Sequence, residues 1–178
     1  MTYLGRYAAT EAGLRRVLLR RIDRWLQAQP DRDTALPAVE TARQAIDALI
    51  RRLAELGAIN DSGFAETRAR SLMRAGQSRR AVQAKLVAKG VAPDLARDAA
   101  GENPAVELAA ALVLARKRRI GPYRVADPDD ARVVHQRELG LLARAGFSRD
   151  TAEQALTMDR AEADDRIHAL RSETSPPG

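Results

Sequence analysis

The sequence predicts an all-α protein, an elongated array of three tandem three-helix repeats, and three observations lead to this prediction. No stretch alternates apolar and polar residues with the β-branched enrichment that is typical of strands. Apolar residues instead recur at three- and four-residue spacing, in runs that begin at capping residues and end at glycines. Finally, residues 86–100 match residues 142–156, which indicates that one packing unit is copied along the chain.

Composition limits what this chain can be. Its 178 residues include 45% hydrophobic but only 3% aromatic residues, so the core must be built from Ala, Leu, Val and Ile. The absence of cysteine excludes disulfides, thiolate metal sites and cysteine nucleophiles, and it fits a reducing compartment. Neither a secretory signal nor an apolar run long enough to span a membrane is visible, so we expect a cytoplasmic protein.

The first two helices are expected on either side of a long loop. From Thr10 to Trp25, Leu14, Leu18 and Ile22 lie on one face of a helix. The segment 27–37 holds two prolines and three charged residues and is predicted to be a loop. A long helix should follow from Pro37 to Leu56 and end at Gly57.

Capping residues and prolines mark the later helices. Asp61 and Ser78 are predicted N-caps, Gly76 and Gly90 are predicted helix ends, and Pro93 suits a first helical turn. Beyond Leu156 the apolar content falls, so a frayed helix followed by disorder is expected. The further helices are predicted at 62–75, 78–90, 93–100, 104–118, 128–145 and 148–156, with a loop at 120–128.

The internal match defines the repeat. Leu86, Gly90 and Asp94 correspond to Leu142, Gly146 and Asp150, a pattern that describes a helix, a tight glycine turn and a short second helix. One longer helix precedes each copy, whereas the first copy is divergent and has Ile22 where the glycine should be. The predicted organisation is repeat 1 at 1–57 with the long loop 27–37, repeat 2 at 58–101, repeat 3 at 102–157 and an acidic, partly disordered tail at 158–178.

Charge suggests an anionic partner for the body of the chain. The net charge is +6, although residues 150–178 hold more acidic than basic residues. Arginine-rich genome composition and ordinary solvated faces are the alternative explanation. The basic residues expected to contact a partner protein or DNA are Arg16, Arg20, Arg24, Arg70, Arg74, Arg79, Arg80, Arg116, Lys117, Arg118 and Arg119.

No pattern in the sequence predicts catalysis, a metal site or a bound cofactor. His135 and His168 lie outside any cluster with ligand spacing, and nucleotide-binding glycine loops are absent. The acidic run at 162–165 is expected to be solvated. We expect Trp25, Phe64, Met73 and Phe147 to be core residues.

The segment "GAINDSGFAETRARSLMRAGQSRRAVQAKLVAKGV" (57–91) resembles the RecX family, small helical regulators of the RecA recombinase. Gly57, Phe64, Ala65, Gly76 and Gly90 stand where the family pattern has them, whereas Asn60 and Gly63 replace an acidic residue and an arginine. The segments "LLARAGFSRDTAEQAL" (141–156) and "YLGRYAATEAGLRRVL" (3–18) resemble the family's third and first repeats. The resemblance covers about residues 3–156.

The resemblance implies a non-enzymatic regulator that lies along the RecA filament, spans neighbouring protomers and depresses ATP hydrolysis, strand exchange and co-protease activity. Whether this chain inhibits or remodels filaments stays open. We expect a monomer that binds DNA, if at all, through phosphates with weak sequence preference, because a stacking row of aromatics is absent. The alternative is a helix-turn-helix-like transcriptional regulator, since residues 78–100 read as two helices about a glycine turn.

Overall fold

The computed structural model describes residues 10–125 and 130–172, and within these ranges every regular element is a helix. The all-α prediction is confirmed. The expected helix start at residues 127 and 128 lies outside the described residues. The helices are α1 (Glu11–Gln27), α2 (Arg32–Glu55), α3 (Asp61–Arg74), α4 (Arg79–Ala88), α5 (Pro93–Ala100), α6 (Pro104–Arg118), the 3₁₀ turn η1 (Gly121–Tyr123), α7 (Ala131–Arg144), α8 (Arg149–Thr157) and α9 (Arg160–Ser172).

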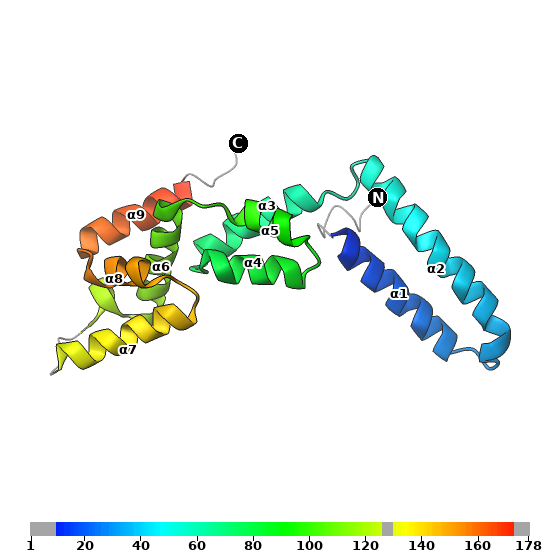
Figure 1. Ribbon diagram of the computed structural model, residues 1–178, viewed down its shortest axis with the longest axis horizontal. Coiled ribbons are helices and arrows are strands. Elements are labelled where there is room, and N and C mark those ends of the chain that lie inside the picture. Colours follow the sequence, from blue (N-terminus) through cyan, green and yellow to red (C-terminus); the bar gives the residue numbers. More distant parts are fainter. Residues whose placement is uncertain (1–9, 126–129, 173–178) are drawn as a thin grey trace.

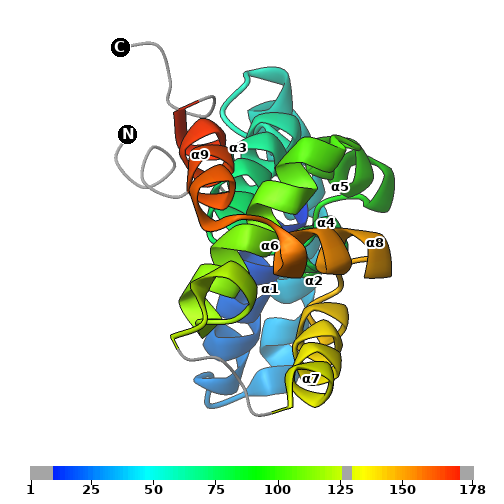
Figure 2. The ribbon, with the colours of Figure 1, turned by 90° about the vertical axis from the view of Figure 1, so that its left-hand side faces the viewer.

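These helices form three bodies that follow one another along an elongated, bent molecule (Figure 1). We call them the hairpin (α1 and α2), the middle module (α3–α5) and the third module (α6–α9). In the third module, α8 and α9 flank α6 on two sides (Figure 2). The elongated arrangement is as predicted, and it is consistent with three repeats. Within the described residues, however, the hairpin supplies two helices where a three-helix unit was expected.

The long loop expected at 27–37 is wrong, because the linker between α1 and α2 is only residues 28–31. The carboxylate of Asp31 accepts hydrogen bonds from the backbone N–H groups of Asp33 and Thr34, at 3.1 and 3.3 Å, and so starts α2 before the proline. Pro37 then lies inside the helix, where it removes one backbone hydrogen bond without ending the helix.

The C-terminal segment also differs from its prediction. Residues 160–172 of the expected partly disordered tail form α9, which packs on α6. Ala163, Ile167 and Leu170 are spaced four and three residues apart, so they share one face of the helix, and all three are buried. The low average hydropathy of this segment hid a short but regular apolar stripe.

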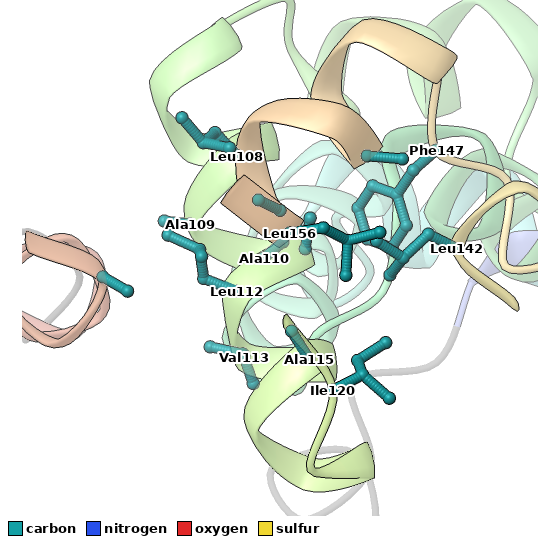
Figure 3. Packing of buried hydrophobic residues seen from close by; sticks show 14 of the residues in the cluster. Leu108, Ala109, Ala110, Leu112, Val113, Ala115, Ile120, Leu142, Phe147 and Leu156 are labelled. Atoms are coloured by element: carbon teal, nitrogen blue, oxygen red, sulfur yellow. The ribbon is translucent and has the colours of Figure 1, made fainter. Parts of the chain in front are cut away.

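The hydrophobic core has two parts, one in each module. In the middle module, Val82 and Leu86 of α4 meet Ala65, Ala69 and Met73 of α3. In the third module, α6 has apolar residues on nearly every side, and these are buried because α8, α9 and the middle module surround the helix. Figure 3 shows Leu142, Phe147 and Leu156 gathered beside α6 in this core.

A hydroxyl N-cap and a glycine turn meet where the middle and third modules join. Ser78, the N-cap of α4, donates a hydrogen bond of 2.6 Å to the carbonyl of Ala145, the last residue before the Gly146 turn. Gly146 has φ +93°, and a Cβ on it would lie 2.6 Å from the Ser78 hydroxyl and 3.5 Å from Cβ of Arg80. In this arrangement, the hydroxyl N-cap of one helix contacts the glycine turn of the next module. We call it an interlock.

A second interlock joins the hairpin to the middle module. Thr10, the N-cap of α1, donates a hydrogen bond of 2.8 Å to the carbonyl of Lys89, which precedes Gly90. A Cβ on Gly90 would lie 2.7 Å from Cβ of Ala12, the residue equivalent to Arg80 of the other interlock. Gly90 and Gly146, which align in the sequence repeat, therefore have the same structural role. The turn at each glycine contacts the N-terminus of a helix from the preceding body.

Candidate functional site: the basic surface of the array

The first predicted basic group is a stripe on α1. Arg16, Arg20 and Arg24 are all exposed, and none of them forms an ion pair with another described residue. Neighbouring residues hold the helix in place instead, because Arg15 pairs with Asp47 of α2 and Arg43 of α2 pairs with Asp23 at 3.0 Å. The three arginines thus remain available to an outside partner.

Trp25 continues this stripe and corrects a prediction. Phe147 and Met73 are buried as expected and Phe64 is half-buried, but Trp25 is 47% exposed. Its exposure follows from the two-helix hairpin, in which α1 packs mainly on α2 and buries none of its residues within the described structure. The hairpin therefore presents an aromatic side chain beside its basic stripe.

The second and third basic groups are less available than the sequence indicated. Arg70 is exposed and contacts Thr67, whereas Arg74 is half-buried and engaged within the protein. Arg79 pairs with Glu102 at 3.2 Å, so it is partly neutralised. Arg80 is exposed beside the Gly146 interlock.

The N-terminus of α4, whose free backbone N–H groups favour an anion, is occupied by a carboxylate of the protein itself. Glu107 of α6 accepts a hydrogen bond of 2.8 Å from the backbone N–H of Arg79, at the N-terminus of α4. Burial raises the pKa of the Glu107 carboxyl above its ordinary value, and the N–H bond and the charge of Arg79 oppose that rise. A carboxylate of the third module thus caps a helix of the middle module.

The four basic side chains at residues 116–119 lie in three different places in the structure. Lys117 donates a hydrogen bond of 2.7 Å from Nζ to the carbonyl of Ala75, at the C-terminal end of α3. Arg118 lines a hollow between the modules together with Arg144. Arg116 and Arg119 line a different hollow on the third module. The structure therefore separates residues that the sequence places in one cluster.

The hollow lined by Arg116 and Arg119 has a volume of about 540 Å³ and also receives Arg124 and Arg160. We call it the arginine basin. Sequence analysis missed the last two residues, because Arg124 lies in a predicted loop and Arg160 in the acidic segment. Only the folding of α9 onto α6 brings Arg160 to the same place as Arg116.

Three contacts fix the walls of the arginine basin. Arg124 donates two hydrogen bonds to Glu138, at 3.1 and 2.6 Å, and the Glu138 side chain is only 7% exposed. Tyr123 donates its hydroxyl to Asp164 at 2.8 Å, and Arg160 lies over its ring, 5.7 Å from the centroid. Burial and the Asp164 hydrogen bond raise the pKa of Tyr123 to about 12, so the hydroxyl keeps the proton that it donates to Asp164.

The remaining candidates do not form a site. His135 lies 2.8 Å from Glu153, between α7 and α8, and His168 is exposed on α9. Within residues 10–125 and 130–172, no group of histidines and carboxylates could hold a metal ion. None of the helices described is long and apolar enough to cross a bilayer.

Comparisons with known proteins agree with this architecture. Residues 60–99, which cover the middle module, match the family model described as RecX, second three-helix domain. A regulatory protein RecX from Myxococcus xanthus is 38% identical over 162 residues, which is 89% of this chain and 82% of the relative. The chain belongs to the RecX family. The family assignment made from residues 57–91 is therefore confirmed.

Two further RecX relatives show how far the likeness extends. The protein from Agrobacterium fabrum is 40% identical over 61% of this chain and 56% of its own length. The protein from Thermobifida fusca is 36% identical over 77% of this chain and 73% of its own length. No solved structure matches the chain. Membership of the RecX family gives this chain a regulatory role.

Proposed function

We propose that this RecX protein binds the RecA recombinase filament as a monomer in the cytoplasm and inhibits its ATPase, strand-exchange and co-protease activities, with non-specific DNA binding as a second contact. The observation that carries the proposal is the interlocked array. Two interlocks of the same design, at Gly90 and Gly146, fix the spacing of three bodies along one molecule. A binder of fixed spacing suits a partner whose own subunits repeat at a fixed spacing.

The effect on the filament follows from unequal affinity. An array that spans neighbouring protomers favours the filament state whose spacing matches its own and disfavours the others. The hairpin supports this proposal, because Arg16, Arg20 and Arg24 have no ion-pair partner in the described structure and can meet acidic side chains of a filament. We infer that the hairpin is the divergent first repeat of the array.

The alternative, a helix-turn-helix-like transcriptional regulator, has less support. The second helix of such a motif would be α5, whose exposed surface carries Asp94 and Asp98. Arg97 on the same surface is paired with Asp94 at 3.1 Å. In such a regulator, the exposed surface of the second helix enters the major groove of DNA. Carboxylates on that surface would be repelled by the DNA phosphates. A selection from random duplexes should therefore return no single motif.

The test is DNA-dependent ATP hydrolysis by the recombinase of the same organism. We expect less than one RecX chain per protomer to lower hydrolysis, since each chain spans several protomers. Replacing Arg16, Arg20 and Arg24 with Gln should weaken inhibition. Replacing three other exposed arginines of the hairpin, Arg32, Arg51 and Arg52, is the matched control and should leave inhibition unchanged. Unaltered hydrolysis at molar excess of folded protein contradicts the proposal.

A further inference from the structure

The arginine basin holds side chains whose placement the fold alone does not explain. Arg119 has φ +55° and ψ +48°, the left-handed conformation, and it is the only non-glycine residue with positive φ in the described structure. Where α3, α4 and α7 end, this chain places Gly76, Gly90 and Gly146 in positive φ. An arginine here keeps a side chain at a backbone cost that glycine would avoid, which is a feature of functional positions.

Arg160 is the second such residue. It is the first residue of α9, at the positive end of the helix dipole, where a cation is unfavourable. Helices α2, α4 and α8 also begin with arginine: Arg79 pairs with Glu102 and Arg149 with Glu153, whereas Arg32, like Arg160, forms no ion pair with a described residue. What distinguishes Arg160 is its place over the ring of Tyr123, 5.7 Å from the centroid, in the wall of the basin. Two independently unfavourable arginines thus line the same hollow.

The basin retains excess positive charge. Glu138 neutralises Arg124, and Asp164 lies 3.8 Å from Arg116 while it accepts the Tyr123 hydroxyl. These carboxylates orient their partners and leave the guanidinium groups of Arg119 and Arg160 for an outside anion. Guanidinium is the side-chain group whose planar fork matches phosphate or carboxylate oxygens in two places at once.

The lining of the basin distinguishes these two kinds of anion. An acidic protein segment needs apolar anchors as well as charge, and fully buried aromatic contacts supply most of the affinity of such interfaces. The ring of Tyr123 is buried under Arg160, so it offers neither an anchor nor a surface on which a base could stack. Val125 also lines the basin and is 83% exposed, but valine is under-represented among the anchors of protein interfaces. Interfaces with nucleic-acid backbones are by contrast polar and strongly basic.

We infer that the arginine basin binds phosphodiester groups of a nucleic-acid backbone, with Arg119 and Arg160 as the phosphate ligands and Arg116 beside them. The inference rests on the DNA-binding part of the proposed function and assigns it to the third module. Binding at this site is independent of sequence, because the contacts go to phosphates and no base is read. The hairpin stripe remains free for the filament.

The test uses fluorescence anisotropy of a labelled mixed-sequence duplex and of a single strand, without recombinase. The variant is Arg119→Gly with Arg160→Gln, and the matched control is Arg149→Gln with Arg171→Gln, which removes two exposed charges from the same module. We expect the basin variant to bind about tenfold more weakly and to lose about 1.8 from its log–log salt slope on duplex, since each phosphate contact contributes about 0.9. The control should bind like the wild type. Arg119→Gly relieves the backbone conformation, and thermal unfolding of both variants checks that each is folded under the binding conditions.

Each other outcome decides against the inference. Equal loss in both variants shows that binding depends on net charge and not on the basin. An oligoglutamate peptide that binds in the basin while DNA does not assigns the site to an acidic protein segment. If the wild type does not bind DNA at low salt, the DNA-binding part of the proposed function fails too. Inhibition of recombinase ATPase, measured in parallel, then shows whether filament regulation stands without it.

Discussion

At the scale of single residues, Gly57 and Gly146 hold the same position with different surroundings. Each follows the C-cap of its helix, and each has positive φ, +67° and +93°. A Cβ on Gly57 would meet nothing within 4 Å, whereas one on Gly146 would lie 2.6 Å from the Ser78 hydroxyl. The pair separates the backbone role of a turn glycine from its role in the interlock.

We predict that Gly57→Ala lowers the free energy of unfolding by about 1–2 kcal/mol, the usual cost of a left-handed alanine. Gly146→Ala should cost about 1–3 kcal/mol more, because the added methyl group forces Ser78 away from Ala145. Urea denaturation of both variants measures the difference. Equal losses would mean that the interlock adds nothing to the turn.

Residue-level reasoning from the sequence identified Gly90 and Gly146 as turns but not as joints. A glycine that ends a helix can be predicted from the sequence, because the turn involves only residues close together in the chain. The residue that presses on this turn, Ser78, bonds to Ala145, which is 67 residues away along the chain, so nothing in the sequence links the two. Arg119 shows the same limit, since its unusual φ is apparent only once the end of α6 is known.

At the scale of helices, several bounds followed from side-chain caps. Asn60, Ser78, Asn103 and Ser148 accept hydrogen bonds from the first turns that they precede, and the helices after them were expected within a residue or two. The predicted N-cap Asp61 was wrong by one residue, because Asn60 accepts the hydrogen bond from the Gly63 N–H and Asp61 is the first residue of α3. Prediction failed where two signals competed, as between Asp31 and Pro37, and where average composition hid periodicity, as in α9. In both segments, composition gave a misleading prediction, whereas the spacing of capping and apolar residues indicated the helix.

The helix α6 also acts on α4 through Glu107, which gives a pH-dependent prediction. Burial raises the pKa of this carboxyl above its ordinary value of 4.5, so the folded protein favours the neutral form. Stability from this group is therefore present below pH 4.5 and is lost as pH rises through the raised pKa. Relative to Glu107→Gln, the wild type should become less stable between pH 4.5 and that higher value.

Urea denaturation of the wild type and Glu107→Gln across this pH range measures the difference. Gln keeps a side-chain oxygen for the Arg79 N–H, so the cap itself survives. Glu102→Gln removes an 82% exposed carboxylate beside the same arginine and controls for the lost charge. A difference that stays constant, or that grows in favour of the wild type as pH rises, contradicts the prediction.

At the scale of the whole molecule, the sequence could predict that the surface is basic but not which basic residues act together. The sequence predicted one cluster of four basic residues at 116–119. In the structure, Lys117 caps α3 and Arg118 lines the hollow between the modules. Arg160 joins Arg116 because α9 packs on α6, a contact that depends on buried apolar residues and not on charge. Clusters of charge are thus a property of the tertiary structure.

The hairpin is held to the rest of the array at one end. Thr10 bonds to Lys89, and the backbone N–H of Glu11 donates a hydrogen bond of 2.9 Å to Asp61. Beyond these contacts α1 and α2 pack mainly on each other, and only Val39, Ile46 and Ile50 are buried along their described length. In contrast, α6 lies among α3, α8 and α9 and buries seven residues.

We therefore predict that the hairpin opens without unfolding the modules. Local opening needs less free energy where few apolar contacts are broken, so backbone amides of α1 and α2 should exchange with deuterium at least about a hundredfold faster than those of α6. Amide exchange followed by mass spectrometry measures this, with α3–α5 expected between the two extremes. Protection of α1 equal to that of α6 would instead make the array one cooperative unit. An arm of low local stability that carries Arg16, Arg20 and Arg24 can adjust along its length to its partner, while the interlock at Gly90 keeps the base of the arm at a fixed place in the array.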